Sequence, residues 1–270
     1  MKNTFVVSCP IDTYSGYGAR SRDFVKSLVE LDKYDVKVLA QRWGHCAWGF
    51  INDHKEEWGF LEPLIIDQLT QQPDIWCQIS VPNEFQKVGK YNIGLTAGIE
   101  TTVCAPQWIE GLNKMDLNLV SSEHAKQVFK TTGYEHKNPQ GQVIGQIKLE
   151  KPIQVLMEGA NLDIYKPLSR KDLKYKDLFT DINSIPEDFS FLFVGHWMQG
   201  DIGEDRKNVG LLIKAFYEMY KNKKKTPALI LKTSITNASN VGRREILKRI
   251  NSICNSILAQ RLPNVYLLHG

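Results

Sequence analysis

The chain has 270 residues, of which 42% are hydrophobic and 24% charged, and its net charge is +4. Such a composition is typical of a soluble globular protein with one large domain or two modest ones, and the mild charge gives no support to a nucleic-acid or membrane partner. No signal peptide is evident, and no apolar stretch approaches the roughly 20 residues of a membrane-spanning helix. Five scattered cysteines without a C-x-x-C pair favour reduced thiols. We therefore expect a cytoplasmic protein.

Strand-like and helix-like segments alternate along the first half of the chain. Strands are predicted at 4–10, 34–41, 73–81, 90–98 and 116–122, helices at 19–32, 105–115 and 123–133, a partly helical stretch at 56–72, and a hairpin or two short strands within 141–161. The expected buried face of the first helix is Phe24, Val25, Leu28 and Leu31. This alternation predicts a parallel sheet that helices cover on both faces.

The stretch "SGYGARSRDF" at 15–24 joins the first strand to the first helix. Gly16 and Gly18 would permit a close backbone approach, and the helix start offers an anion site. Ser21 stands where the third glycine of G-x-G-x-x-G would fall, so the dinucleotide fingerprint is incomplete. A tight turn without a ligand explains this pattern equally well.

Between Tyr165 and Glu187 the chain becomes polar and charged, which is typical of a connector between domains. The alternation then resumes. Strands are predicted at 189–197, 227–233 and 264–270, and helices at 209–221 and 243–259, the first of these burying Val209, Leu212, Ile213, Phe216 and Tyr220. We predict an α/β protein with two Rossmann-like domains, residues 1–165 and 188–270, joined by residues 166–187.

The second domain is expected to be incomplete. It has three predicted strands. A complete doubly wound domain usually has about five or six strands. Either the chain is a fragment, or another polypeptide completes it, or the domain is simply very small.

Three loops follow strands at positions where open parallel sheets bind ligands. Besides the glycine loop, "GHWMQGDIGEDRKN" places Arg206 and Lys207 at a helix start, where their charge opposes the helix dipole. A bound anion would offset this cost, so we favour a functional pair over a solvated charge run. Glu100 in the third loop is a candidate carboxylate or a structural acceptor for backbone amides. His196, at a strand tip, is a candidate contact or an ordinary exposed imidazole.

With these loops placed, the sequence resembles GT-B glycosyltransferases, specifically the retaining family 4. The segments "SGYGARSRDFVKSL" and "LNLVSSEHAKQVFKTTGY" are similar to that family's first helix start and to its strand-serine-helix element. "EGANLDIYKP" at 158–167 is similar to the G-V-D-x-x-x-F-x-P element, with Asn161 in place of the usual Asp. "FLFVGHWMQGDIGEDRKNVGLLIKAF" resembles the first strand and R-K-N helix start of the second domain, and "PALILKT" and "NVYLLHG" its next two strands.

The resemblance implies transfer of a sugar from a nucleoside diphosphate sugar to an acceptor, with retention of configuration. The donor would bind mainly to the second domain and the acceptor mainly to the first. Arg206 and Lys207 would hold the diphosphate, and Glu100 is the third residue assigned to catalysis. The residues assigned to donor binding are Gly16, Tyr17, Gly18, His196 and Asn161. No metal and no cofactor besides the donor are expected.

The family's second domain continues into a segment with two glutamates that bind the donor, and the chain ends at Gly270 before that segment could occur. We therefore expect activity to require that portion, from a longer product or from a second chain. A non-catalytic subunit or inactive binding module of the same fold is the alternative reading. A nucleotide-sugar epimerase is the third and weakest reading, because it would need other acids and a complete second domain.

Overall fold

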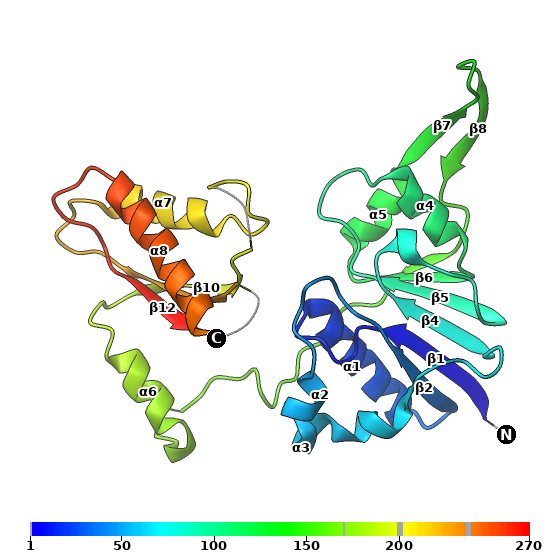
Figure 1. The fold of residues 1–270 in the computed structure, drawn as a ribbon, viewed down its shortest axis with the longest axis horizontal. Helices are drawn as coiled ribbons and strands as arrows, with labels where there is room; N and C mark the ends of the chain where they lie inside the picture. The colour runs from blue at the N-terminus through cyan, green and yellow to red at the C-terminus, as the bar shows by residue number, and fades with distance from the viewer. Residues whose placement is uncertain (1, 170, 199–201, 236–238) are drawn as a thin grey trace. The chain divides into compact units, whose positions relative to one another are not determined.

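The computed structural model describes residues 2–169, 171–198, 202–235 and 239–270. The chain divides into two compact units, Met1–Ala160 and Asn161–Gly270 (Figure 1). Each unit has its own parallel sheet, and most of the predicted strands and helices are present in the predicted order. None of the helices in the described part is long and apolar enough to cross a membrane.

The described residues of the first unit include a seven-stranded sheet in the order β3-β2-β1-β4-β5-β6-β9, with every neighbouring pair parallel. Its strands are β1 (Asn3–Cys9), β2 (Tyr34–Ala40), β3 (Ile65–Ile66), β4 (Ile75–Ile79), β5 (Tyr91–Thr96), β6 (Leu117–Val120) and β9 (Ile153–Val155). The chain runs from β1 outward to β3, then returns to β4 and continues in the opposite direction. The strand order therefore reverses between β1 and β4.

Helices and turns cover both faces of this sheet. On β1, Phe5 and Val7 belong to one buried cluster and Val6 to another, as the alternation of side chains along a strand requires. Helix α1 contributes to the first cluster, and helices α4 and α5 contribute to the second. The helical segments are α1 (Gly16–Glu30), α2 (Phe50–Asp53), α3 (Lys55–Trp58), η1 (Gly59–Leu64), η2 (Pro82–Glu84), α4 (Pro106–Asn113) and α5 (Glu123–Thr131).

Local signals set where these helices begin. Ser122 accepts the N–H of Ala125 at 3.1 Å, so α5 begins with the serine cap that the sequence predicts. Pro106 is the first residue of α4, where its missing N–H costs no hydrogen bond. The predicted burial of α1 is only partly confirmed. Val25 and Leu28 are buried, whereas Leu31 lies after the last helical residue and is exposed.

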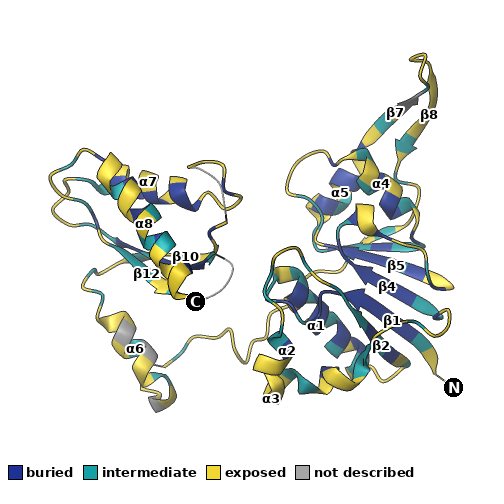
Figure 2. Cartoon of the chain, in the orientation of Figure 1, coloured by how far each residue is buried: buried dark blue, intermediate teal, exposed yellow. Residues whose placement is uncertain are grey.

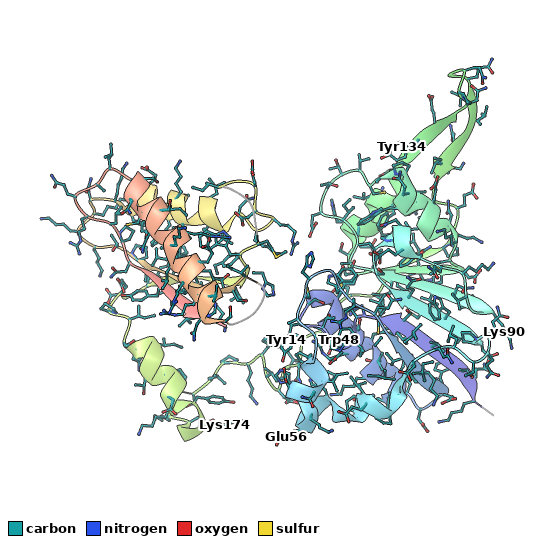
Figure 3. All side chains as sticks on the ribbon, in the orientation of Figure 1. Tyr14, Trp48, Glu56, Lys90, Tyr134 and Lys174 are labelled. Atoms are coloured by element: carbon teal, nitrogen blue, oxygen red, sulfur yellow. The ribbon has the colours of Figure 1, made fainter. Side chains whose placement is uncertain are left out.

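Strands β7 (Gly133–Lys137) and β8 (Val143–Lys148) form a separate antiparallel hairpin that projects beyond α4 and α5 (Figure 1). Tyr134, at the base of the hairpin, donates its hydroxyl to the carbonyl oxygen of Cys104 (Figure 3). The hairpin begins at Gly133, earlier in the chain than the predicted one within 141–161.

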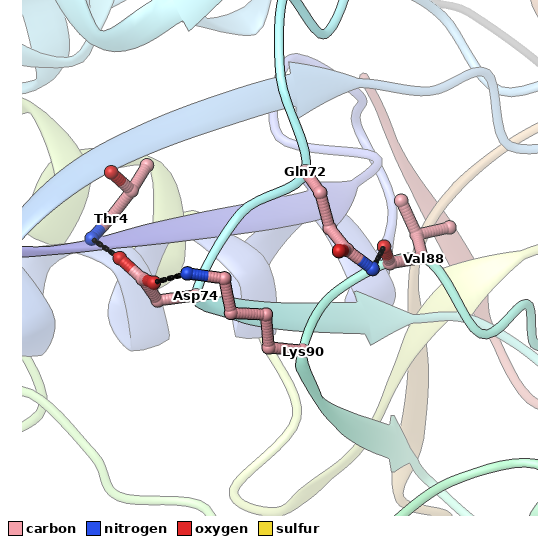
Figure 4. Close-up of polar contacts among 5 residues, drawn as sticks. All are labelled: Thr4, Gln72, Asp74, Val88 and Lys90. Carbon is pink, nitrogen blue, oxygen red and sulfur yellow. Dashed lines mark hydrogen bonds and ion pairs between the residues drawn. The ribbon is translucent and has the colours of Figure 1, made fainter.

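Side chains tie the strands together at the amino edge of the first sheet. Asp74 accepts the N–H of Thr4 at 3.0 Å and pairs with the ammonium of Lys90 at 2.7 Å (Figure 4). Gln72 donates to the carbonyl oxygen of Val88 at 3.1 Å. The hydrogen bond from Lys90 holds the pKa of Asp74 below its ordinary value. These side chains therefore connect the starts of β1, β4 and β5.

The described residues of the second unit include a three-stranded parallel sheet in the order β10-β11-β12. Its elements are η3 (Leu173–Tyr175), α6 (Lys176–Asn183), β10 (Ser190–His196), α7 (Val209–Tyr220), β11 (Ala228–Ser234), α8 (Asn240–Ser256) and β12 (Val265–His269). The predicted connector thus contains a helix, α6, that its polar composition did not reveal. Helix α7 buries Val209, Ile213 and Phe216, but Leu212 is 38% exposed, contrary to prediction, because it lies on the outer face.

Helices α7 and α8 pack on one face of this sheet with Phe193, Leu229 and Leu231. The alternate residues Leu192 and Val194 are 64% and 67% exposed, and Figure 2 shows β10 with little buried surface (Figure 2). Strand crossovers are right-handed. Because both connections move the chain in the same direction, β10 to β11 to β12, both helices fall on the same face.

Candidate functional site

The reversal of strand order between β1 and β4 marks the place in the first unit where an open parallel sheet binds ligands. At such a switch point the loops that leave the two strands diverge to opposite faces, which exposes the carboxyl ends of the strands. The glycine loop leaves β1 at this point. The structure therefore places Gly16, Tyr17 and Gly18 at the expected edge of the sheet.

Gly16 and Gly18 differ in whether the surrounding structure leaves room for a side chain. A Cβ atom on Gly18 would lie 2.3 Å from the carbonyl oxygen of Thr13, so the loop cannot pack as it does with a larger residue. A Cβ atom on Gly16 would have no described atom within 4 Å. Ser15 caps the helix by accepting the N–H of Gly18 at 2.9 Å. Packing therefore accounts for Gly18, and the open space at the helix start lies at Gly16.

Tyr17 links the glycine loop to the loop that follows β5. Its hydroxyl lies 3.1 Å from Oγ1 of Thr96 and accepts the N–H of Ala97 at 3.1 Å. Its ring stacks on Trp43, with centroids 4.0 Å apart. Burial raises the pKa of Tyr17, and the nearby carboxylate of Glu158 raises it further. Tyr17 is therefore neutral at physiological pH and acts there as a hydrogen-bonding group and a packing surface.

Arg20 connects the same helix turn to the end of β9. Its two terminal nitrogens donate to the carbonyl oxygens of Leu156 at 2.7 Å and Met157 at 3.2 Å. Its Nε atom is buried without a hydrogen-bond partner among the described residues. These bonds fix the backbone that leads to Glu158, one of the carboxylates near Tyr17.

Glu100 lies in the loop after β5, four residues beyond Thr96, and its side chain is exposed. The contacts of Tyr17 with Thr96 and Ala97 bring this loop beside the glycine loop. His124 is bonded through Nε2 to the carbonyl oxygen of Thr101 at 3.2 Å, which ties the loop to α5. Within the described residues Glu100 forms no hydrogen bond or ion pair, so its catalytic role stays a prediction.

Arg206 and Lys207 lie in the turn directly before Asn208, the N-cap residue of α7. Both side chains are exposed, and neither forms a hydrogen bond or ion pair within the described part of the chain. Asp205 shapes the turn from inside. It is 2% exposed, and its Oδ2 atom accepts the N–H of Val209 at 2.9 Å. Among the described residues, the two predicted cations at this helix start therefore have no ion-pair partner.

His196 is the last residue of β10 and lies at the carboxyl edge of the second sheet. Its Nδ1 atom is 3.3 Å from the hydroxyl oxygen of Ser234, at the end of β11. Asn161 is exposed, and its side-chain oxygen accepts the N–H of Asp163 at 3.0 Å in a local turn. Their assignment to donor binding remains a prediction that these contacts allow.

Sequence reasoning did not single out Arg20, Trp43 or Thr96. Trp43 could have been found from the sequence. It follows the predicted strand at 34–41, and the three loops selected as candidate ligand sites also follow predicted strands. Arg20 could not be found this way, because its partners Leu156 and Met157 are distant in sequence. Within the described residues, no three His, Cys, Asp or Glu side chains form a group that could hold a metal ion.

No protein-family model matches the chain, and no curated protein sequence matches it. Solved structures do match. An α,α-trehalose 6-phosphate synthase from Burkholderia multivorans is 10% identical with a TM-score of 0.51, and the match covers 100% of this chain and 74% of that one. A structure titled trehalose-6-phosphate from E. coli, bound with UDP-2-fluoro glucose, is 12% identical with a TM-score of 0.47, covering 99% of this chain and 73% of that one.

What is shared is the fold. The chain has the Rossmann-like GT-B architecture, as its sequence predicts. At 10% identity the likeness shows the architecture alone, and membership of the retaining family 4 stays a prediction.

Proposed function

We propose that this protein is a glycosyltransferase that moves a sugar from a nucleoside diphosphate sugar to an acceptor hydroxyl with retention of configuration. The fold supports this reading, because it is the architecture of proteins that carry out sugar transfer. The observation that carries it is the pair Arg206 and Lys207, exposed and unneutralised within the described residues at the start of α7.

The proposed chemistry is assisted by positive charge beside the diphosphate. When the bond between the sugar C1 atom and the diphosphate breaks, negative charge grows on the departing phosphate oxygens. Fixed cations stabilise that charge more in the transition state than in the ground state, and so accelerate the reaction. Arg206 presents a planar fork of donors and Lys207 a compact charge, and both groups pair well with phosphate.

Asp205 and Asn208 would position the two cations. Asn208 adopts a left-handed conformation with φ of 53°, and Asp205 holds the first N–H of α7. The turn between them is thereby set before any ligand arrives. The N-terminal end of α7 adds its own partial positive charge at the same place.

In the proposed reaction the acceptor hydroxyl attacks C1 from the face that the diphosphate leaves. Its proton passes to the departing phosphate oxygen, so the products are the glycosylated acceptor and a nucleoside diphosphate. In the first unit, the open helix start at Gly16, the neutral Tyr17 and the carboxylate of Glu100 are the groups that would contact the reacting sugars. His196 and Asn161 would complete the donor contacts on the second unit.

The test is calorimetric titration of the chain with UDP-, GDP- and ADP-sugars. We expect one of these to bind, and we expect Arg206→Ala and Lys207→Ala each to weaken binding about 10-fold or more, since each removes charged hydrogen bonds. Lys214→Ala is the matched control, because Lys214 is an exposed cation on α7 outside the turn. Unchanged affinity in both variants would exclude the proposed diphosphate site.

Sugar transfer is measured separately, by release of the nucleoside diphosphate. If a nucleotide sugar binds but its sugar is transferred to none of the acceptors supplied, the result would instead support a non-catalytic module of the same fold. Turnover that persists in a double variant, Arg206→Ala with Lys207→Ala, would show that other groups neutralise the leaving diphosphate.

A further inference from the structure

The segment from Arg42 to Gly49, which follows β2, has almost no regular secondary structure, but it is tightly anchored. Asp12, beside the glycine loop, holds its far end. The carboxylate of Asp12 accepts the N–H groups of Ile51 at 2.7 Å and Gly49 at 3.2 Å, and its carbonyl oxygen accepts that of Phe50 at 3.1 Å. Asp12 thereby fixes the end of the segment at Gly49 and the start of α2, so this end needs little further ordering when a ligand binds.

Two more contacts join the segment to the loop between β1 and α1. The N–H of Tyr14 donates to the carbonyl oxygen of Ala47 at 3.0 Å, and Trp48 forms an isolated antiparallel bridge with Thr13. At the near end, Trp43 stacks on Tyr17. The segment therefore lies directly beside the glycine loop, at the carboxyl edge of the first sheet.

Trp48 is the exposed aromatic group of this segment. The residue is 37% exposed, and it lies next to Tyr14 (Figure 3). The guanidinium of Arg42 lies over its ring, 4.6 Å from the centroid. Arg42 is itself exposed and forms no ion pair with a described carboxylate. An indole and an unneutralised guanidinium are thus held together on a rigid surface.

We propose that Trp48 and Arg42 bind an acidic saccharide, and that this saccharide is the acceptor. That the saccharide is the acceptor rests on the proposed glycosyl transfer. That Trp48 and Arg42 bind an acidic saccharide does not. The face of an indole ring is electron-rich, and the C–H bonds on one side of a pyranose ring carry partial positive charge, so the two surfaces attract. Because the guanidinium of Arg42 already covers part of the Trp48 ring, the saccharide would stack on the part of the ring that stays exposed. The stack also removes apolar area of both groups from water.

Arg42 supplies the selection for acidic sugars. Its guanidinium matches the two oxygens of a carboxylate, sulfate or phosphate group in bidentate geometry. A neutral saccharide would gain the stack on Trp48 but would leave the guanidinium without an anion. The surface should therefore bind both kinds of saccharide and prefer the acidic kind.

The first experiment presents the whole labelled chain to an array of neutral and acidic oligosaccharides. We expect binding to be concentrated on saccharides that contain uronic acid, sulfate or phosphate groups, and to weaken as salt is raised. Binding to no saccharide, or equal binding to neutral and acidic ones, would overturn the proposal.

The second experiment measures affinities of variants for an oligogalacturonate and for a neutral glucose oligomer of equal length. Trp48→Ala should weaken binding of both oligomers about 10-fold, and Arg42→Gln should weaken only that of the oligogalacturonate, to the level of the neutral oligomer. Tyr91→Ala is the matched control, because Tyr91 is an exposed aromatic residue at the first position of β5, at the opposite edge of the sheet. Equal losses in the control, or none in the two variants, would overturn the assignment.

Titration of the same variants with the nucleotide sugar separates the two proposals. Trp48→Ala and Arg42→Gln should leave donor affinity unchanged, because the donor cations are Arg206 and Lys207. If no nucleotide sugar binds while the acidic saccharide does, the transferase proposal fails and the saccharide site stands. If the nucleotide sugar binds and no saccharide does, the saccharide site fails and the transferase proposal stands.

Discussion

The two units solve the same problem of covering a parallel sheet in different ways. In the first unit the strand order reverses between β1 and β4, so helices lie on both faces and two separate cores form. In the second unit the strands of the described part follow one another across the sheet in a single direction. Leu192 and Val194, on one face of that sheet, are exposed to solvent. The direction of the connections, and not the composition of the strands, decides which faces are covered.

The units also differ in charge. Residues 1–160 contain 16 Lys and Arg and 19 Asp and Glu, whereas residues 161–270 contain 18 Lys and Arg and 11 Asp and Glu. The overall net charge of +4 conceals this asymmetry. A basic second unit favours the approach of anionic ligands, because the summed field raises the local concentration of anions.

The largest expected effect tests the difference between the two faces of the second sheet. Leu231, on the covered face, is fully buried against the helices. Leu231→Ala should lower the free energy of unfolding of that unit by about 2–5 kcal/mol, because it leaves a cavity. Leu192→Ala, on the open face, should change it by about 0.5 kcal/mol or less. Urea denaturation measures both, and equal losses would mean that the open face is covered in solution.

The next effect concerns the glycine loop of the first unit. Gly18→Ala places a Cβ atom against the carbonyl oxygen of Thr13 and should cost about 1–3 kcal/mol of stability. Gly16→Ala has open space and should leave stability unchanged or slightly higher. The same two variants sharpen the site assignment, because a phosphate that approaches Gly16 would bind less well to the stable Gly16→Ala protein. Comparable destabilisation by both substitutions would contradict the packing argument.

A smaller effect is expected at the start of α7 in the second unit. Asp205→Ala removes the acceptor for the N–H of Val209 and should lower stability by about 1 kcal/mol. Asp205→Asn retains an oxygen acceptor and should recover most of that loss. Thermal denaturation compares the two variants with the parent chain. Failure of the Asn variant to recover stability would show that the carboxylate charge, and not the hydrogen bond, is what the turn requires.

The smallest effect is the pH dependence of the amino edge of the first sheet. The pKa of Asp74 is lowered in the folded state by its hydrogen bond from Lys90, so this contact stabilises the fold above the unfolded pKa of the carboxyl group. That contribution is lost as the pH falls through the folded pKa. Lys90→Met should raise the pKa of Asp74 toward its ordinary value, which an NMR titration of the carboxyl carbon measures. An unchanged titration would assign the lowering to the N–H of Thr4 instead.

Much of the fold was predictable because its signals are local. Period-two and period-3.6 patterns located most of the strands and helices, and Ser122 marked a helix start. The exposed positions of Leu31 and Leu212 were not predictable from spacing, because burial depends on which helix face the neighbouring elements cover. The helix α6 escaped prediction because its polar composition masks a short amphipathic pattern.

The sequence alone determined the alternation of elements, the glycine loop, and the cations at the start of α7, since each depends on residues close together in the chain. Only the tertiary structure decided that Tyr17 meets Thr96, that Arg20 holds the end of β9, and that Trp48 lies against Thr13. These contacts join residues up to 137 positions apart. They depend on strand order, which local patterns do not encode, because the same strands satisfy the same periodicity in any order.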